Sequence, residues 1–587
     1  MKRKQSAKRT RQSFLHGALL LTAGVLLVKV IGALFKIPLS AVITEDGMGY
    51  FSTAYSFYNV IFSVATAGFP VAVSRMVSER DSLGRWNDIR RIQKVSVPIF
   101  LLTGAVGTAL MVLSAPLYTK AVGNPGALPA MLALAPSVLL CSLASAYRGY
   151  HEGLRNMTPT TVSQIIEALA KLLFGLSGAY LIMNGCSREF QETGTIFGRI
   201  VSDAASAQRM TCALGAAAAI LGVSVGSALS ALFLYLYDRR GDGITAEQLC
   251  AVPRPVARKV LAGELIRSSL PIAVGAVTMS VSGLIDASFL QTRIAYILNT
   301  DPEPLLSMYA GSIPAENLSA PASIPNYLFG CYNMALTLFM LVPSVTQAFG
   351  VSALPSVTHA YAGGVKKELQ KAMETVLRVT CLFAIPAGIG LSVLAQPIAA
   401  LIYGDRISTP IIGKTLAIMG IAAIFAAVTT PLGSMLQAVG HMELPVILVL
   451  AGLLVKVVLN YLLAGIPQIN ILGGGISTLV CYVLVTAAEL IALIRITGIR
   501  LDLFTAVFKP AGAAVLCGLA AWYAQRAGLG FGWSVRLSAV AAIMIAVLVY
   551  VVFLLLFGAV QKEDLALLPG GEKIIKTHEK YLKKTGG

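Results

Sequence analysis

The chain has 587 residues, 56% of them hydrophobic and 13% charged, with a net charge of +18. A soluble domain carries roughly 25% charged residues, so this composition excludes an ordinary soluble protein and indicates a membrane protein. The positive charge lies mainly in predicted cytoplasmic segments, and it indicates anionic membrane lipids as partners rather than nucleic acid.

Long apolar segments dominate the sequence. About 20 apolar residues in a helix cross roughly 30 Å of hydrocarbon, and backbone amides left unpaired in lipid are costly. By this measure the sequence predicts an all-α polytopic membrane protein with about fourteen transmembrane helices. The predicted spans are 14–39, 49–75, 95–115, 127–147, 159–184, 208–237, 265–290, 325–350, 374–396, 411–437, 444–466, 472–494, 507–525 and 535–557.

Both ends of the chain are basic. The N-terminal stretch MKRKQSAKRTRQSF precedes an apolar run longer than the core of a signal peptide, so we expect a retained first span. Loops rich in Lys and Arg stay in the cytoplasm, and their alternation along the chain places both termini inside. We therefore expect a multi-pass protein of the plasma membrane with cytoplasmic termini.

Two stretches suggest an internal repeat. VAVSRMVSERDSLGRW, from Val71, and VSALPSVTHAYAGGVK, from Val351, share a small-residue helix end, a polar exit and a glycine in a basic loop. This predicts two six-helix lobes with a pseudo-twofold repeat, followed by two C-terminal helices. The predicted divisions are a basic tail 1–13, an N-lobe 14–237, a cytoplasmic linker 238–263, a C-lobe 264–494, two helices in 495–557 and a cytoplasmic tail 558–587.

Motifs for cofactor chemistry are missing from the sequence. The eight cysteines form no CxxC pair and the five histidines are far apart, so we expect no metal site. GKT at 413–415 ends like a phosphate-binding loop, but the required glycine is replaced by Ser408, which argues against ATP hydrolysis. We expect no cofactor, and a coupling ion is left open.

Ionisable residues inside spans are the best functional pointers in such a chain. Lys29 and Lys36 are seven residues apart in the first span, so they share a face and lie roughly 10 Å apart along the axis. Lys29 is near the midplane and is expected to face a water-filled cavity. Lys36 is closer to the outer headgroups, so it either lines the cavity or extends to the surface.

Asp286 lies in the seventh span at about the same depth as Lys36. If both spans line a cleft between lobes, the two side chains pair in one conformational state and separate in another. Asp286 would then be a counter-charge or a switch.

Three further cations each have two interpretations. Lys171 follows Glu167 by four residues, so the pair neutralises itself or Lys171 faces the cavity. Lys456 lies near the midplane of its span, where it either faces the cavity or pairs with a structural partner. Arg75 lies at the end of the second span, where it either anchors the helix at the membrane surface or binds the headgroup of the cargo. A mainly cationic set suits an anionic cargo such as a phosphate or pyrophosphate.

Several segments together resemble a known family: KVIGALFKIPLS, EDGMGYFSTAYSFYNVIFSVATAGFPVAVSRMVSE, RNMTPTTVSQIIEALAKL, GLIDASFL and SMLQAVGHMELPVILVLAGLLVKVVLN. From about residue 14 to 495 the chain resembles the oligosaccharide flippases of the multidrug/oligosaccharidyl-lipid/polysaccharide superfamily, in the stage V sporulation protein B and MurJ-like branch. The resemblance implies two six-helix bundles around a central cavity, and alternating access. It also implies that Lys29, Lys36 and Arg75, in spans 1 and 2, bind pyrophosphate, with lysines as point charges rather than bidentate forks.

The sequence thus predicts a flippase that moves a polyprenyl-pyrophosphate-linked oligosaccharide from the inner to the outer leaflet. Lipid II, the peptidoglycan precursor, is the favoured cargo, and cell-wall synthesis proteins are candidate partners. A cation-coupled multidrug exporter and a flippase for a capsule or exopolysaccharide unit are the alternatives. A membrane-bound glycosyltransferase would show clustered acidic residues or a large outside domain, so we expect a transporter rather than an enzyme.

Overall fold

The computed structural model describes residues 14–66, 68–201, 203–239 and 255–559. Apart from one short β-hairpin, the regular structure of this part is helical. The predicted basic tail, most of the predicted linker and nearly all of the predicted C-terminal tail lie outside the described residues.

Two compact units make up the structure. The first comprises Met1–Pro302 and Ile313–Asn333, and the second comprises Glu303–Ser312 and Met334–Gly587. This division differs from the boundary that the sequence suggested, because the helix that carries the seventh predicted span belongs to the first unit. The two lobes of six helices each stay a prediction.

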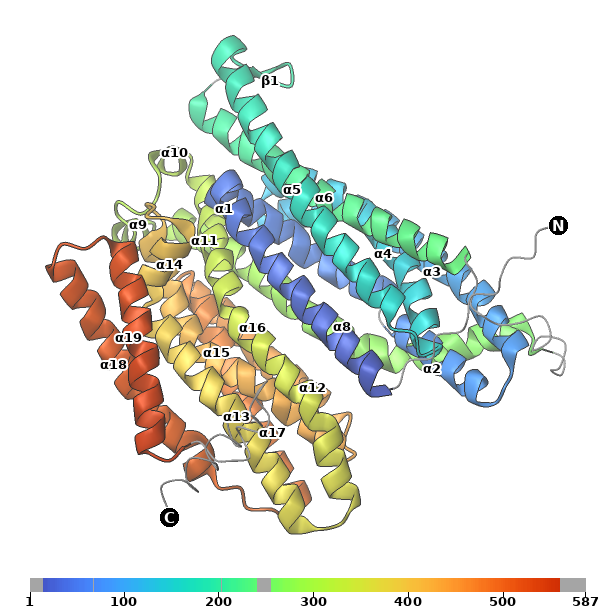
Figure 1. Cartoon of the computed structure of the whole chain (residues 1–587). Helices are drawn as coiled ribbons and strands as arrows, with labels where there is room; N and C mark the ends of the chain where they lie inside the picture. Colours follow the sequence, from blue (N-terminus) through green and yellow to red (C-terminus); the bar gives the residue numbers. More distant parts are fainter. Residues whose placement is uncertain (1–13, 67, 202, 240–254, 560–587) are drawn as a thin grey trace. The chain divides into compact units, whose positions relative to one another are not determined.

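The first unit is a bundle of long helices (Figure 1). Within it α5 packs along α6, α4 packs against α3 and α6, and α1 packs against α5. Its elements are α1 (Phe14–Thr66), α2 (Phe69–Ser82), α3 (Trp86–Val122), η1 (Pro125–Ala127), α4 (Leu128–Gly153), α5 (Thr158–Thr193), β1 (Thr195–Ile196), β2 (Arg199–Ile200), α6 (Ala204–Arg239), α8 (Arg258–Thr300), α10 (Ala315–Leu318), η2 (Pro321–Ser323) and the first part of α11 (Ile324–Phe339).

Helix α1 contains the first predicted span and most of the second. It is 53 residues long and is kinked at Thr44, where φ is 59° and ψ is −172°. The kink falls between the predicted spans 14–39 and 49–75. The two halves of α1 therefore correspond to two separate spans joined without a loop.

The second predicted span does not continue to residue 75 as one helix. Gly68 has φ 82°, a left-handed conformation that favours glycine, and α2 begins at the next residue. A Cβ atom at Gly68 would lie 2.2 Å from the backbone oxygen of Ser269 in α8. The break therefore brings the start of α2 directly against α8.

Close approach of α5 and α6 depends on small residues. A Cβ atom at Gly222 of α6 would lie 2.3 Å from the backbone nitrogen of Gly175 in α5. Such small residues let helix backbones pack by van der Waals contact where lipid provides no hydrophobic driving force. These two helices lie side by side in Figure 1, with the β-hairpin at their tip.

The second unit is built around α15, which packs against α12, α13 and α17. The last two helices, α18 and α19, form an antiparallel pair that contacts α13 and α14 (Figure 1). Its elements are α9 (Glu303–Met308), the last part of α11, α12 (Leu341–Ala362), α13 (Lys366–Val393), α14 (Ala395–Tyr403), α15 (Thr409–Ala438), α16 (Leu444–Ala464), α17 (Leu472–Thr497), the π-helical η3 (Phe504–Phe508), α18 (Lys509–Gly530) and α19 (Val535–Leu556).

Twelve segments of the described chain are long and apolar enough to cross a membrane. One of them, Ala23–Ser82, contains the second predicted span and most of the first. The predicted span 265–290 lies in α8, which is not among the twelve. The prediction of an all-α polytopic membrane protein is confirmed. The cytoplasmic location of the termini stays a prediction.

Candidate functional site

Two of the predicted site residues lie near each other inside the first unit. Lys36 is on α1 and Lys171 is on α5, and their like charges interact. Both side chains are half-buried. Although these lysines are far apart in sequence, the packing of α1 against α5 brings them together in a largely apolar bundle.

Aromatic rings hold the Lys171 ammonium group. Its Nζ atom lies 4.9 Å from the ring centroid of Phe35 and 4.9 Å from that of Tyr55. A cation over the face of an aromatic ring gains roughly 0.5–2 kcal/mol, more when it is desolvated. Phe35 and Tyr55 come from the two sides of the α1 kink, so the kinked helix supplies both contacts.

The charge of Glu167 is compensated chiefly by an arginine from another helix. Its Oε2 atom accepts a hydrogen bond of 2.8 Å from Arg148 Nη2 of α4. The same guanidinium donates to Ser163 Oγ at 3.0 Å and to Ser230 Oγ at 2.8 Å. Glu167 and Lys171 also interact, so the sequence-based pairing of these two charges is joined by a partner from α4 that the sequence did not indicate.

Positive charge is in excess around this site. Lys36, Lys171 and Arg148 supply three positive groups. Glu167 interacts with Lys171 and Arg148, and the carboxylate of Glu152 also interacts with Arg148, which leaves one positive charge in excess. Charges in apolar surroundings are costly unless they are compensated. The arrangement is suited to an anion, and we call Lys36, Lys171, Phe35, Tyr55 and the Arg148–Glu167 pair the cationic cluster.

Lys29 and Arg75 are placed differently from Lys36. Lys29 is half-buried on α1, roughly 10 Å along the helix from Lys36. Arg75 is exposed on α2, beyond the break at Gly68. A role for either residue in binding cargo stays a prediction.

Asp286 of α8 is buried, with 5% of its surface exposed. Its Oδ2 atom accepts a hydrogen bond of 2.9 Å from the Tyr332 hydroxyl of α11. No sequence pattern predicted this tyrosine as a partner of Asp286. Alternating pairing of Asp286 with Lys36 concerns a change of conformation and stays a prediction.

Lys456 belongs to the second unit, on α16. It is 5% exposed and lies one helical turn before the fully buried Asn460. Burial at this level shows that protein encloses the side chain, and the midplane position stays a prediction. Its part in binding cargo stays a prediction.

Metal-binding geometry is not found in the part of the chain that the structure describes. No group of three or more His, Cys, Asp or Glu side chains there could hold a metal ion. The seven cysteines at described positions form no disulfide with one another and are buried. The chemistry of the cationic cluster is accordingly that of charge and hydrogen bonding.

Two protein families match separate parts of the chain. The polysaccharide biosynthesis protein family matches residues 14–185, and the MatE family matches residues 325–462. Over 483 residues, 80% of each chain, the sequence is 24% identical to the lipid II flippase MurJ of Bacillus subtilis (strain 168). Over 562 residues, 95% of this chain and 98% of the relative, it is 22% identical to the stage V sporulation protein B of the same organism.

The fold also matches a solved structure, described as lipid II flippase MurJ in an inward closed conformation. The TM-score is 0.61 at 13% identity, and the match covers 92% of this chain and 98% of the other. Together, the two family matches and the two relatives support a resemblance to the multidrug/oligosaccharidyl-lipid/polysaccharide superfamily.

These similarities confirm the resemblance that the sequence segments carry, including the MurJ and stage V sporulation protein B branch. One relative is named a lipid II flippase, and two of the solved structures are named a lipid II flippase and a multidrug resistance transporter. They support a multi-pass membrane flippase, and the cargo is a separate question.

Proposed function

We propose that this protein moves a polyprenyl-pyrophosphate-linked oligosaccharide, with lipid II as its principal cargo, from the inner to the outer leaflet by alternating access. The observation that carries the proposal is the excess positive charge of the cationic cluster, where Lys36 and Lys171 interact with each other. A pyrophosphate would compensate both ammonium groups at once. A cationic drug would add to their repulsion.

The lipid tail of such a cargo stays in the bilayer during transport. Moving it into a polar cavity would forfeit about 0.8 kcal/mol per CH₂ group. The protein therefore needs to shield only the pyrophosphate and the sugar. Side chains on α1 and α5 that attract phosphate are sufficient for the charged part of this task.

The relatives support this cargo above the alternatives. One is named a lipid II flippase and matches 80% of the chain. The match of residues 14–185, which contain the cationic cluster, to the polysaccharide biosynthesis protein family also fits a flippase for a capsule or exopolysaccharide unit. The MatE match over residues 325–462 keeps a multidrug exporter as the second candidate.

A reconstitution experiment tests the proposal. The full-length protein is placed in vesicles containing fluorescent lipid II, and movement is followed with a reagent that does not cross the bilayer. We expect the wild type to move lipid II and the Lys36→Gln/Lys171→Gln variant to lose most of that activity. Lys120→Gln, which removes an exposed charge at the end of α3, is the matched control and is expected to behave as wild type.

The alternatives give different results in the same vesicles. Movement of a polyprenyl-linked capsule unit but not of lipid II would reassign the cargo. Transport of a cationic dye without movement of any lipid-linked sugar would favour the multidrug exporter. In cells, the protein should restore exposure of lipid II on the outer leaflet after depletion of the native lipid II flippase.

A further inference from the structure

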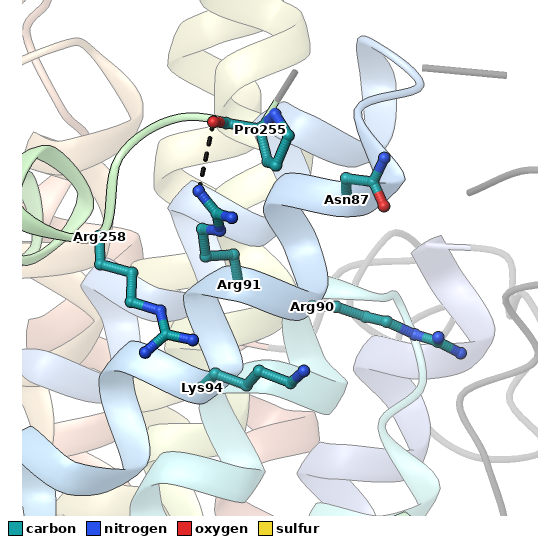
Figure 2. Close-up of a pocket in the computed structure, with 6 residues that line it drawn as sticks. All are labelled: Asn87, Arg90, Arg91, Lys94, Pro255 and Arg258. Atoms are coloured by element: carbon teal, nitrogen blue, oxygen red, sulfur yellow. Dashed lines mark hydrogen bonds between the residues drawn. The ribbon is translucent and has the colours of Figure 1, made fainter. Parts of the chain in front are cut away.

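A basic pocket lies at the beginning of α3 and α8 in the first unit, away from the cationic cluster. Its volume is about 250 Å³. Figure 2 shows the residues that line it: Asn87, Arg90, Arg91, Lys94, Pro255 and Arg258. Nothing in the proposed transport of lipid-linked sugars uses this pocket.

The wall of the pocket is held by hydrogen bonds between α3 and the segment before α8. Arg91 Nη1 donates to the backbone oxygens of Pro255, at 3.3 Å, and Val256, at 2.9 Å. The backbone N–H of Val256 donates to Asp88 Oδ1 at 2.7 Å. The other carboxylate oxygen of Asp88 lies 2.7 Å from Arg85 Nε. This carboxylate therefore serves the wall and is not directed at the remaining cations.

Positive charge is in excess within the pocket. Four of its six lining side chains are cationic. Among the residues that the structure describes, Lys94 and Arg258 take part in no ion pair, and both are exposed. The pocket also lies at the N-termini of two helices, whose dipoles favour negative charge. An anion would relieve this repulsion and complete the site.

The position along α3 corresponds to the headgroup layer of a bilayer. Residues 95–119, which follow Lys94 directly, contain no charged side chain. The apolar run of the span thus starts immediately beyond the pocket. A ligand in the pocket would lie at the boundary between hydrocarbon and water, where lipid phosphates are found.

We propose that this pocket binds the phosphodiester headgroup of an anionic phospholipid, such as phosphatidylglycerol. The volume suits a headgroup, since pockets that enclose drug-sized ligands begin at about 300 Å³ and a lipid-linked oligosaccharide is larger still. Guanidinium groups match phosphate oxygens in geometry as well as in charge. Basic pockets between membrane helices bind anionic headgroups in the same way.

Lipid titration of the full-length protein in neutral detergent tests the proposal. The Tm is followed with dioctanoyl phosphatidylglycerol, dioctanoyl phosphatidylcholine or inorganic phosphate. We expect saturable stabilisation by phosphatidylglycerol, much less by the other two, and an apparent affinity weakened roughly tenfold or more in Lys94→Gln/Arg258→Gln. Lys366→Gln/Lys367→Gln, which removes two exposed charges at the start of α13, is the matched control and should bind as wild type.

Several outcomes would overturn the assignment. Equal stabilisation by phosphatidylcholine would mean that charge is not recognised. Equal effects of inorganic phosphate and phosphatidylglycerol would make this a site for free phosphate. Unchanged lipid affinity in Lys94→Gln/Arg258→Gln would place the binding elsewhere. Because Tm and not transport is measured, the result is independent of the proposed cargo.

Discussion

Lys171 is the side chain at which function and stability are expected to separate. Replacement of Lys171 by Gln removes a half-buried ammonium group and its like-charge interaction with Lys36. The variant also loses the ring contacts and the attraction to Glu167, so we expect the Tm in detergent to stay about level. Lipid II movement in vesicles should fall about tenfold or more, since one phosphate contact is lost. Measurement of both quantities on the same preparation checks the prediction.

The conservative variant Lys171→Arg distinguishes charge from packing. It keeps a cation that can lie against Phe35 and Tyr55, so it should retain most of the activity. If Lys171→Arg were as inactive as Lys171→Gln, the charge would not be the important property. A Tm lowered by Lys171→Gln would equally contradict the argument from repulsion.

The Arg148–Glu167 pair is expected to be structural. Arg148→Ala leaves a half-buried carboxylate without its partner, so it should destabilise the protein by about 2–3 kcal/mol. The double variant Arg148→Ala/Glu167→Ala should lose less free energy of unfolding than the sum of the two single variants. A double-mutant cycle on thermal unfolding gives the coupling, for which we expect about 1–3 kcal/mol. Additive effects would show that the pair does not interact energetically.

A charge inside a predicted span was enough to select Lys36 and Lys171 as candidates from the sequence. Their mutual proximity could not be predicted, because it depends on how α1 packs against α5. Arg148 was missed for a related reason: it directly follows a predicted span and was assigned to a basic loop. Only the hydroxyls of Ser163 and Ser230, on two other helices, reveal its interior position.

At the scale of elements, the break between α1 and α2 makes a sharp test possible. In Gly68→Ala the alanine has to adopt an unfavourable φ of 82°, and its Cβ atom clashes with the backbone oxygen of Ser269. We expect the free energy of unfolding to fall by about 2–5 kcal/mol. Gly84→Ala is the matched control, since its φ is 67° and a Cβ atom there has open space. Gly84→Ala should lower the free energy of unfolding by only about 1–2 kcal/mol.

Thermal unfolding of the two variants in detergent measures the difference. Equal losses would mean that the contact of Gly68 with α8 is not constraining. The break itself was not predicted, because glycine is common within membrane helices and hydropathy does not register backbone dihedrals. An interruption near Thr44 was easier to predict from the sequence, since the polar TEDG stretch interrupts the apolar run.

For the whole molecule, division into two units predicts that a local disturbance stays within one of them. Gly518→Val in α18 would place side-chain atoms against Ile389 of α13, from which a Cβ atom would already be only 2.8 Å. We expect faster hydrogen exchange in α13 and α18 and unchanged exchange in α5 and α6.

Gly530→Val serves as the control, because a Cβ atom there meets nothing within 4 Å. Faster exchange in both units after Gly518→Val would contradict the division into two units. The sequence predicted the helices of both units well, because each apolar run is fixed by the thickness of a bilayer. The sequence could not predict that α8 belongs to the first unit, since no local pattern indicates which helices a given helix packs against.

The rings that hold Lys171 also matter when no cargo is present. Under the proposed function, a carrier that has released an anionic cargo still has to change conformation on its return leg, with its excess positive charge left behind. Phe35 and Tyr55, whose ring centroids each lie 4.9 Å from the ammonium group, would then act as a substitute for solvation. We expect closer rings to speed the return and to weaken binding of the cargo, so that the two rings would set the balance between turnover and affinity.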